Sequence, residues 1–345
     1  MPPFAHDFPF DPSYGRTLDK LLQIPAPAAP AGFDGFWRSR YEAARRVEPE
    51  PRIGELVEER DGVRIFDVTY TSTRGRCGGW LVLPADGAPV RHGFVIGHGY
   101  GGRDQVGRDV PLPLPGSAAL LPCVTGMPVK GLLAGVPNVA HDHVVHGIDS
   151  RDGYIIGDCV ADLWCAASAL TELVPELAGG GLGYLGESFG GGLGALALPW
   201  DERFAAAQLQ VPTFGNHPLR LTLPCVGSGE AVRRHHRDHP GIVDVLAYYD
   251  AATAATRMRI PVLVAPALFD PSVPPPGQFA VYNALPGPRE LHVLQAGHFA
   301  HNGDDLAEQA LRTATTEFFA EHLERPRVRA RARREGSADR AGRDD

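Results

Sequence analysis

The sequence predicts an α/β fold, in which a mostly parallel central sheet carries helices on both faces and follows an N-terminal arm. Short apolar runs at 92–97 and 260–265 are typical of strands that are buried on both sides of such a sheet. Between them, residues 155–177 repeat apolar side chains at helical spacing, with Trp164 on the buried face. The 345 residues are enough to bury a sizeable core, and the 41 glycines and 32 prolines suit many connecting turns.

The chain is predicted to have three parts. Residues 1–52 form the N-terminal arm, with a Pro/Ala-rich linker and one helix around Trp37. Residues 53–323 form the main α/β unit. Residues 324–345 are rich in arginine and lack apolar periodicity, so we expect a disordered tail there.

A glycine-flanked serine is the most informative motif. The pattern G-x-S-x-G occurs once, at 186–190, and centres on Ser188. A short apolar run precedes it and a helix start of small residues follows it, which is the strand, turn and helix context of a nucleophile elbow. A side chain at position 186 or 190 would clash where the strand and the helix pass close together. The motif therefore predicts Ser188 as a nucleophile.

An acid and a histidine follow at the ends of two later strands. Asp270 comes after the run 260–265, and His298 comes after the apolar segment 290–294. The 28 residues that separate them leave room for one helix and one strand. The carboxyl ends of parallel strands meet at one sheet edge, and the chain order Ser, acid, His is that of an elbow-type triad. We therefore expect Asp270 and His298 to complete a triad with Ser188.

A glycine-rich turn supplies a candidate oxyanion hole. The strand at 92–97 leads into His98-Gly99-Tyr100-Gly101-Gly102-Arg103. In an elbow-type site, one N–H donor belongs to the residue after the nucleophile and the other to the loop after an early strand. These donors are expected to be the backbone N–H groups of Phe189 and Tyr100.

With these motifs the chain resembles the acetyl xylan esterase and cephalosporin C deacetylase family of the α/β-hydrolase superfamily. The similarity covers about residues 8–322. It is carried by the segments 33–37, 66–70, 79–84, 98–103, 186–192, 246–251, 270–275, 279–288 and 297–298.

The resemblance implies a serine esterase that removes acetyl groups from small O-acetylated substrates, such as xylo-oligosaccharides and cephalosporin-type acetates. Ser188, Asp270 and His298 would act as the triad, and the unit 53–323 would be catalytic. Tyr100, Phe189 and Pro274 would contact the substrate, and no cofactor would be needed. Relatives of this kind often form rings, so a homo-oligomer is possible, with the arm as a candidate subunit contact.

The chain departs from the family at two places. Glutamine usually follows the nucleophile, whereas this chain has Phe189, which puts an apolar wall beside the acyl group. The segment 104–146 is also atypical and ends in a loop with His141, Asp142, His143 and His146. These departures concern the leaving group that is accepted, because the reaction needs only the backbone N–H of residue 189.

Other classes are disfavoured by composition. The net charge of −8 argues against nucleic acid as a partner. We see no apolar run of about 18 residues for a membrane span and no apolar leader. The five cysteines are odd in number and form no C-x-x-C, so we expect reduced thiols and a cytoplasmic protein. The histidines at 141–146 and 235–239 lack a metal-site spacing, and we expect no metal.

Two alternatives remain open. One is another α/β-hydrolase activity, either of the dienelactone hydrolase type or peptidase-like. The other is a non-catalytic α/β-hydrolase scaffold that acts as a binding protein. A complete triad argues against the second alternative, since binding alone does not require all three groups.

Overall fold

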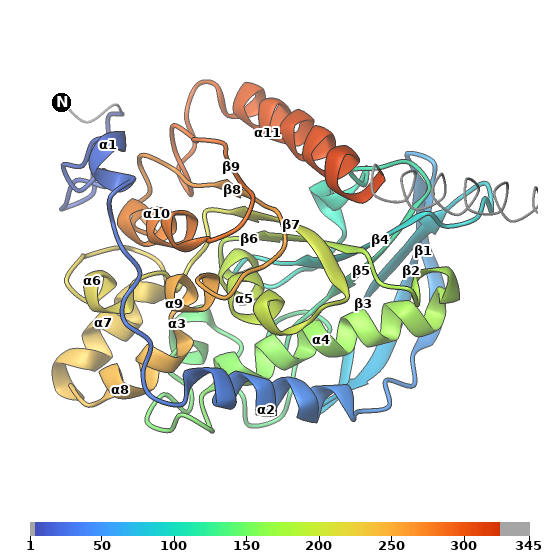
Figure 1. Ribbon diagram of the computed structural model, residues 1–345, viewed down its shortest axis with the longest axis horizontal. Coiled ribbons are helices and arrows are strands. Elements are labelled where there is room, and N and C mark those ends of the chain that lie inside the picture. Colours follow the sequence, from blue (N-terminus) through green and yellow to red (C-terminus); the bar gives the residue numbers. More distant parts are fainter. Residues whose placement is uncertain (1–3, 325–345) are drawn as a thin grey trace, which may run out of the picture.

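The computed structural model of the chain describes residues 4–324, which form a mixed sheet covered by helices on both faces (Figure 1). Within these residues the sheet has nine strands in the order β1-β2-β3-β5-β4-β6-β7-β8-β9. The pairs β1·β2, β2·β3 and β3·β5 are antiparallel, and all the others are parallel. The strands are β1 (Arg52–Arg60), β2 (Val63–Ser72), β3 (Gly75–Pro84), β4 (His92–Gly97), β5 (Ser117–Pro122), β6 (Leu182–Glu187), β7 (Phe204–Gln210), β8 (Val262–Ala265) and β9 (Arg289–Leu291). The predicted α/β fold is confirmed.

The sequence of each strand matches its place in the sheet. Strands β4, β5 and β8 lie inside the sheet and are buried throughout, as expected for parallel strands covered on both faces. Glycine at position 183 of β6 makes room for the Phe94 ring of β4, since a Cβ there would lie 2.3 Å from that ring. Strand β1 is an edge strand, nearly all exposed and rich in charge.

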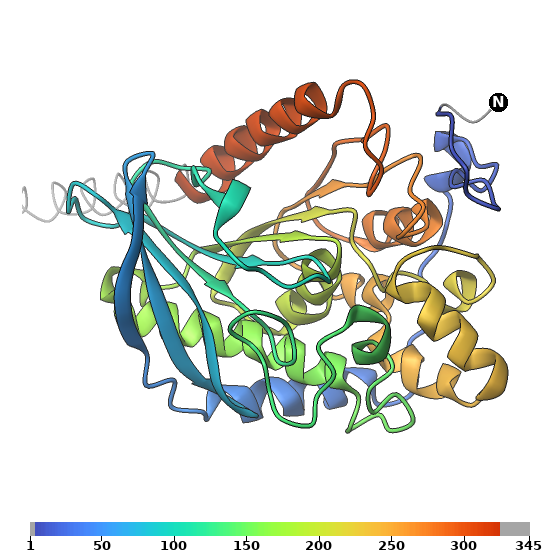
Figure 2. The ribbon, with the colours of Figure 1, turned by 180° about the vertical axis from the view of Figure 1, so that it is seen from behind.

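The helices divide between the two faces of the sheet. Helices α2, α4 and α5 cover one face, and α11 lies across the other (Figures 1 and 2). Their bounds are α1 (Leu18–Leu21), α2 (Phe33–Arg45), α3 (Ala140–His143), α4 (Ile155–Leu173), α5 (Phe189–Ala197), α6 (His217–Arg220), α7 (Ser228–Asp238), α8 (Ile242–Leu246), α9 (Ala251–Ala255), α10 (Pro275–Ala284) and α11 (Asp304–Phe319). None of the helices within residues 4–324 combines the length and the hydropathy that crossing a bilayer requires.

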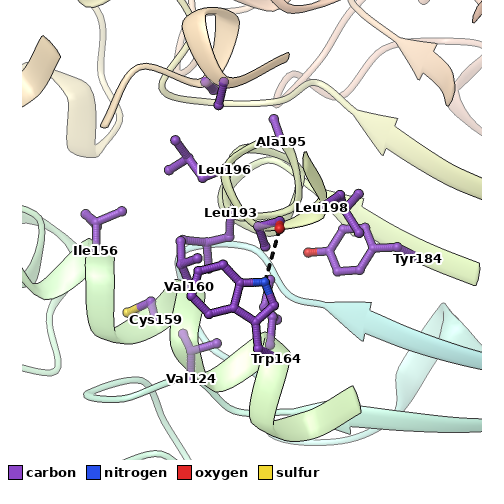
Figure 3. Close-up of a cluster of buried hydrophobic side chains, with 14 of the residues drawn as sticks. Val124, Ile156, Cys159, Val160, Trp164, Tyr184, Leu193, Ala195, Leu196 and Leu198 are labelled. Atoms are coloured by element: carbon purple, nitrogen blue, oxygen red, sulfur yellow. Dashed lines mark hydrogen bonds between the residues drawn. The ribbon is translucent and has the colours of Figure 1, made fainter. Parts of the chain in front are cut away.

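Trp164 lies at the centre of the core beneath the sheet. It is 0% exposed, and its indole Nε1 donates a hydrogen bond of 3.0 Å to the carbonyl oxygen of Ala197 on α5 (Figure 3). Its ring also makes edge contacts with Trp37 of α2 and with Tyr41. Helix α4 thus joins the arm to the helix that follows the candidate nucleophile, and the prediction of Trp164 as a core residue is confirmed.

The N-terminal arm packs against its own chain. Phe33 and Trp37 are buried, and the Trp37 indole donates to the carbonyl oxygen of Tyr248 at 2.8 Å. The Pro/Ala-rich stretch is held too, because side chains of the main unit donate to three of its carbonyl oxygens. These pairs are Asn216 to Pro25, Thr253 to Pro27 and Tyr248 to Ala31. The predicted disordered tail lies outside the described residues, apart from Glu324.

Candidate active site

Ser188 occupies a tight turn between strand β6 and helix α5. Its backbone angles are φ 55° and ψ −108°, a conformation that residues with a side chain rarely adopt. A Cβ at Gly186 would lie 2.5 Å from the carbonyl oxygen of Gly190, and a Cβ at Gly190 would lie 2.8 Å from the carbonyl carbon of Gly97. The close approach that the glycines of the motif predict is therefore present.

The structure brings Ser188, Asp270 and His298 together from three strand ends. The Ser188 hydroxyl is 2.8 Å from His298 Nε2, and His298 Nδ1 is 2.8 Å from Asp270 Oδ2. Because a carboxylate only accepts, the Nδ1–H donates to Asp270, which leaves Nε2 free to accept from the Ser188 hydroxyl. The three groups therefore have the hydrogen-bonding order of a nucleophile, a base and an orienting acid.

Asp270 is held on both of its oxygens. Oδ1 accepts from the backbone N–H groups of Ser272 at 2.8 Å and Val273 at 2.9 Å. Oδ2, which faces His298, also accepts from the side-chain amide of Gln278 at 2.9 Å. The other end of this amide, Oε1, accepts from the backbone N–H of Ala267 at 2.7 Å, so the fully buried Gln278 ties helix α10 to the loop after β8 that carries Asp270. Sequence reasoning did not find Gln278, since a glutamine on a helix carries no signal of burial.

His298 has a raised pKa for electrostatic reasons. Burial lowers the pKa of its imidazole, but the charge and hydrogen bond of Asp270 raise it more, and the charge of Glu187 adds to the rise. Glu187 is the residue before the nucleophile. The surrounding protein shields the Glu187 carboxyl from water, which raises its pKa. The imidazole is therefore a stronger base than an ordinary histidine.

The two predicted oxyanion residues are neighbours in space. The rings of Tyr100 and Phe189 stack with centroids 4.0 Å apart, and the N–H of Gly190 donates to the carbonyl oxygen of His98 at 2.9 Å. Phe189 is the first residue of α5, where an N–H has no partner inside the helix. In the turns, loops and caps of residues 4–324, neither the Tyr100 N–H nor the Phe189 N–H donates to another backbone group. Both donors are thus free to bind an oxygen of a ligand.

His143, from the atypical segment 104–146, supports Tyr100. Its Nε2 lies 3.0 Å from the carbonyl oxygen of Thr125 and its Nδ1 lies 2.9 Å from the Tyr100 hydroxyl. A carbonyl only accepts, so Nε2 carries the proton and the Tyr100 hydroxyl donates to Nδ1. Burial lowers the pKa of His143 to about 4, so the ring is neutral at pH 7. Nothing in the sequence separates this buried histidine from the exposed His141 two residues earlier.

The other predicted residues lie apart from this cluster. Pro274 is buried and caps the start of α10, four residues after Asp270, and its contact with substrate stays a prediction. Asp142 and His239 are exposed, and His236 is half-buried. Across residues 4–324, no group of three or more His, Cys, Asp or Glu side chains is placed to hold a metal ion.

A cavity of about 920 Å³ lies beside His298 of the triad. The segment 102–113, several strand ends and helix α11 enclose it, and Glu187 and His298 lie in its wall. Ser188, Tyr100 and Phe189 are not among its lining residues. The Phe189 ring instead contacts the ring of Phe214.

Comparisons with known proteins find a family and several similar folds. The model of the acetyl xylan esterase family matches residues 17–316. An acetyl xylan esterase from Paenibacillus sp. R4 superposes with a TM-score of 0.75 at 23% identity, covering 89% of this chain and 100% of that one. Acetyl xylan esterase 1 from Thermoanaerobacterium sp. JW/SL YS485 gives 0.73 at 21% identity, covering 90% and 99%. An acylaminoacyl peptidase from Pyrococcus horikoshii shares the fold alone, with a TM-score of 0.58 at 15% identity over 81% of this chain and 43% of that one.

Proposed function

Because the chain belongs to the acetyl xylan esterase family and is a carboxylic ester hydrolase, we propose that it removes acetyl groups from small O-acetylated substrates through a Ser-His-Asp acyl-enzyme. Acetylated xylo-oligosaccharides and cephalosporin-type acetates are the substrate types in question. The observation that carries this proposal is the unbroken chain of hydrogen bonds from Ser188 through His298 to Asp270.

The proposed reaction has two halves. His298 Nε2 takes the proton of the Ser188 hydroxyl while Ser188 Oγ attacks the acetyl carbonyl, and the N–H groups of Phe189 and Tyr100 bind the developing oxyanion. His298 then gives this proton to the departing alcohol oxygen, which leaves an acetyl ester on Ser188. In the second half, water loses a proton to His298 and attacks this ester. His298 passes this proton to Ser188 Oγ as the ester bond breaks, and acetic acid leaves.

Neighbouring side chains support each role. Asp270 keeps the imidazole in the tautomer that accepts from Ser188 and stabilises the imidazolium. His143 holds the Tyr100 ring, and this ring stacks on Phe189, so the two N–H donors are carried by residues that pack on each other. The reaction needs no cofactor, because serine, water and the imidazole supply every bond and proton. The five buried, unpaired cysteines suit a reducing compartment, and we propose a cytoplasmic location.

Hydrolysis of 4-nitrophenyl esters by the purified full chain tests the proposal. We expect the acetate to be cleaved faster than the butyrate or hexanoate, because the Phe189 ring crowds the acyl group. Replacing Ser188 with alanine should lower kcat by at least about 10³-fold, while circular dichroism and the melting temperature stay close to wild type. A Ser228→Ala variant, on helix α7, is the control and should keep full activity.

Three results would overturn the proposal. The first is unchanged turnover by Ser188→Ala, which would remove Ser188 from the reaction. The second is a preference for hexanoate or longer chains, which would indicate a general carboxylesterase. The third is activity on peptide or lactone substrates with none on acetates, which would favour the peptidase-like or dienelactone alternatives.

A further inference from the structure

Arg220, at the end of helix α6, is a buried cation without a counter-charge in contact. It is only 7% exposed. Within residues 4–324 its guanidinium forms neither a hydrogen bond nor an ion pair, and burial lowers its pKa. An isolated charge removed from water is costly, so buried charges in proteins are normally paired.

Two other poorly exposed arginines show what pairing looks like in this protein. Arg203 forms an ion pair with the fully buried Asp201 and donates to the carbonyl oxygen of Trp164 at 2.9 Å. Arg103 lies 3.2 Å from Asp109 and donates to the carbonyl oxygen of Ile96. Arg220 is as deeply buried as Arg103 but has no such partner.

The groups around Arg220 are already engaged elsewhere. Asp250 attracts the guanidinium, but its two oxygens accept from the backbone N–H of His217 at 2.6 Å and of Thr253 at 2.8 Å. The hydroxyls of Tyr14 and Tyr154 donate to the carbonyl oxygens of Pro224 and Val144. The Cys225 thiol also lies near, but burial raises its pKa, so it stays uncharged. Within residues 4–324, no charged group therefore forms an ion pair with Arg220.

Arg220 lies near the aromatic residues of the candidate site. Its Cζ is 5.8 Å from the centroid of the Phe214 ring, and that ring is 5.9 Å from the ring of Phe189. Its charge also reaches the Tyr100 hydroxyl, where it opposes the rise in pKa that burial causes. Through these contacts the cation adjoins the stacked rings that carry both candidate oxyanion donors.

The guanidinium has little freedom to turn away. A Cβ at Gly229, on α7, would lie 2.6 Å from Arg220 Nη2, and a Cβ at Gly277, on α10, would lie 3.4 Å from Cδ. Helices α7 and α10 thus confine the side chain at the two positions where they carry glycine. A rigid and planar donor of this kind matches a carboxylate, which it can bind through two parallel hydrogen bonds.

We propose that Arg220 binds a carboxylate on the alcohol part of the acetyl ester, so that the preferred substrates are anionic acetates. This inference rests on the proposed function. The acetyl group itself has no charge, so the anion has to belong to the part of the substrate that leaves. The substrate carboxylate then supplies the counter-charge that the fold omits, and neutral acetates bind more weakly.

Matched pairs of aryl acetates test this inference. The 2-, 3- and 4-acetoxybenzoates are compared with the corresponding carboxamides, which keep the shape and lack the charge. For the wild-type chain, kcat/KM should favour at least one carboxylate over its carboxamide. In Arg220→Gln this preference should fall by about 10-fold or more, mainly through KM, and the loss on 4-nitrophenyl acetate should be clearly smaller than the loss on the carboxylates.

Two further variants make the result specific. Arg220→Lys keeps a charge without the planar fork and should recover part of the preference. Arg234→Gln, on the neighbouring helix α7, removes an arginine whose side chain is 72% exposed and should change nothing. An unchanged carboxylate preference in Arg220→Gln would overturn the inference, and so would an equal loss on charged and neutral esters, which indicates a structural role.

A binding measurement separates the two failures. In the Ser188→Ala background, 4-acetamidobenzoate should raise the melting temperature, and the rise should disappear when Arg220→Gln is added. If wild type cleaves no acetate while this rise persists, the proposed function fails and the anion site stands. If chloride or phosphate raises the melting temperature as much as the carboxylate does, the site binds inorganic anions and the inference about substrate is wrong.

Discussion

At the scale of single residues, the strained turn at Ser188 is possible because glycines surround it. Holding a residue with φ 55° and ψ −108° costs about 1–3 kcal/mol, which the packing around the turn has to offset. That packing depends on backbone atoms approaching where other residues would place a Cβ, as at Gly186 and Gly190. The same constraint that makes the motif recognisable in the sequence therefore fixes where the Ser188 hydroxyl lies.

Gln278 acts on the reaction through Asp270. We predict that Gln278→Met lowers kcat by about 10-fold or more, because Asp270 loses a hydrogen bond on the oxygen that orients His298. KM should change little, since Gln278 makes no contact with the reacting groups. Steady-state kinetics on 4-nitrophenyl acetate give the comparison, with Gln309→Met on the exposed side of α11 as the control. An unaltered kcat in the folded Gln278→Met variant would contradict the positioning role.

Glu187 sets part of the pH dependence. His298 has to be neutral to accept a proton, so activity should rise with pH through about 6–7.5, where a histidine base loses its proton. Because the pKa of His298 is raised, the midpoint should lie above the ordinary value of about 6.5. Glu187→Gln removes a negative charge that favours the imidazolium, and the midpoint of kcat/KM should move to lower pH.

Profiles of kcat/KM between pH 5 and 9 measure this shift. The exposed Glu317→Gln, on α11, is the control and should leave the profile in place. A midpoint that stays fixed in Glu187→Gln would mean that the charge of Glu187 does not reach His298. A shift to higher pH would be opposite in sign and would refute the electrostatic account.

At the scale of elements, helix α4 joins the arm to the elbow helix. We predict that Trp164→Ala destabilises the protein by about 3–5 kcal/mol, because the ring is fully buried between α2 and α5 and leaves a cavity when it is removed. Trp164→Phe should cost less, since it keeps most of the ring contacts. Urea unfolding followed by circular dichroism measures both, and Leu306→Ala, at a 73% exposed position, should change the free energy of unfolding by less than about 0.5 kcal/mol. A loss of under 1 kcal/mol for Trp164→Ala would contradict this role.

The elements near the site were the ones that the sequence could predict. Strands β4, β6 and β8 are short apolar runs that end in glycine, in an acid and before a proline, so the local sequence indicates both the type and the end of each strand. Strand β1 could not be predicted, because it is polar and exposed and owes its conformation to pairing with β2. The same distinction holds in the site. Ser188 follows its strand in sequence, whereas the roles of Gln278 and His143 depend on partners brought close by the fold.

At the scale of the whole molecule, the arm packs against its own chain, and another surface is a candidate for joining copies of the chain. The aromatic side chains of α2 are packed against α4 and Tyr248, so they are not available to a second copy. Apolar side chains of β1 are exposed instead, at Ile53, Leu56 and Val57. This edge strand is therefore the candidate contact for the oligomer that the family resemblance implies.

We predict that light scattering gives a mass for the full chain well above the 37.0 kDa of one copy. Leu56→Lys should reduce this mass, because it places a charge in the exposed apolar strip of β1. Lys substitution at the exposed Val243, on helix α8, is the matched control and should leave the mass unchanged. A monodisperse monomer for wild type would refute the oligomer, and a mass that resists Leu56→Lys would exclude β1 as its contact.

Two contacts of the N-terminal arm, with Asp270 and with Pro224, also bear on the order in which the protein folds. The N–H of Asp270 donates to the carbonyl oxygen of Pro12 at 3.1 Å, and the Tyr14 hydroxyl donates to Pro224. A ribosome makes residues 12 and 14 long before Pro224 and Asp270, so their partners are absent when they emerge. This stretch therefore waits without its contacts while the intervening chain is made, and its docking belongs to the late steps of folding.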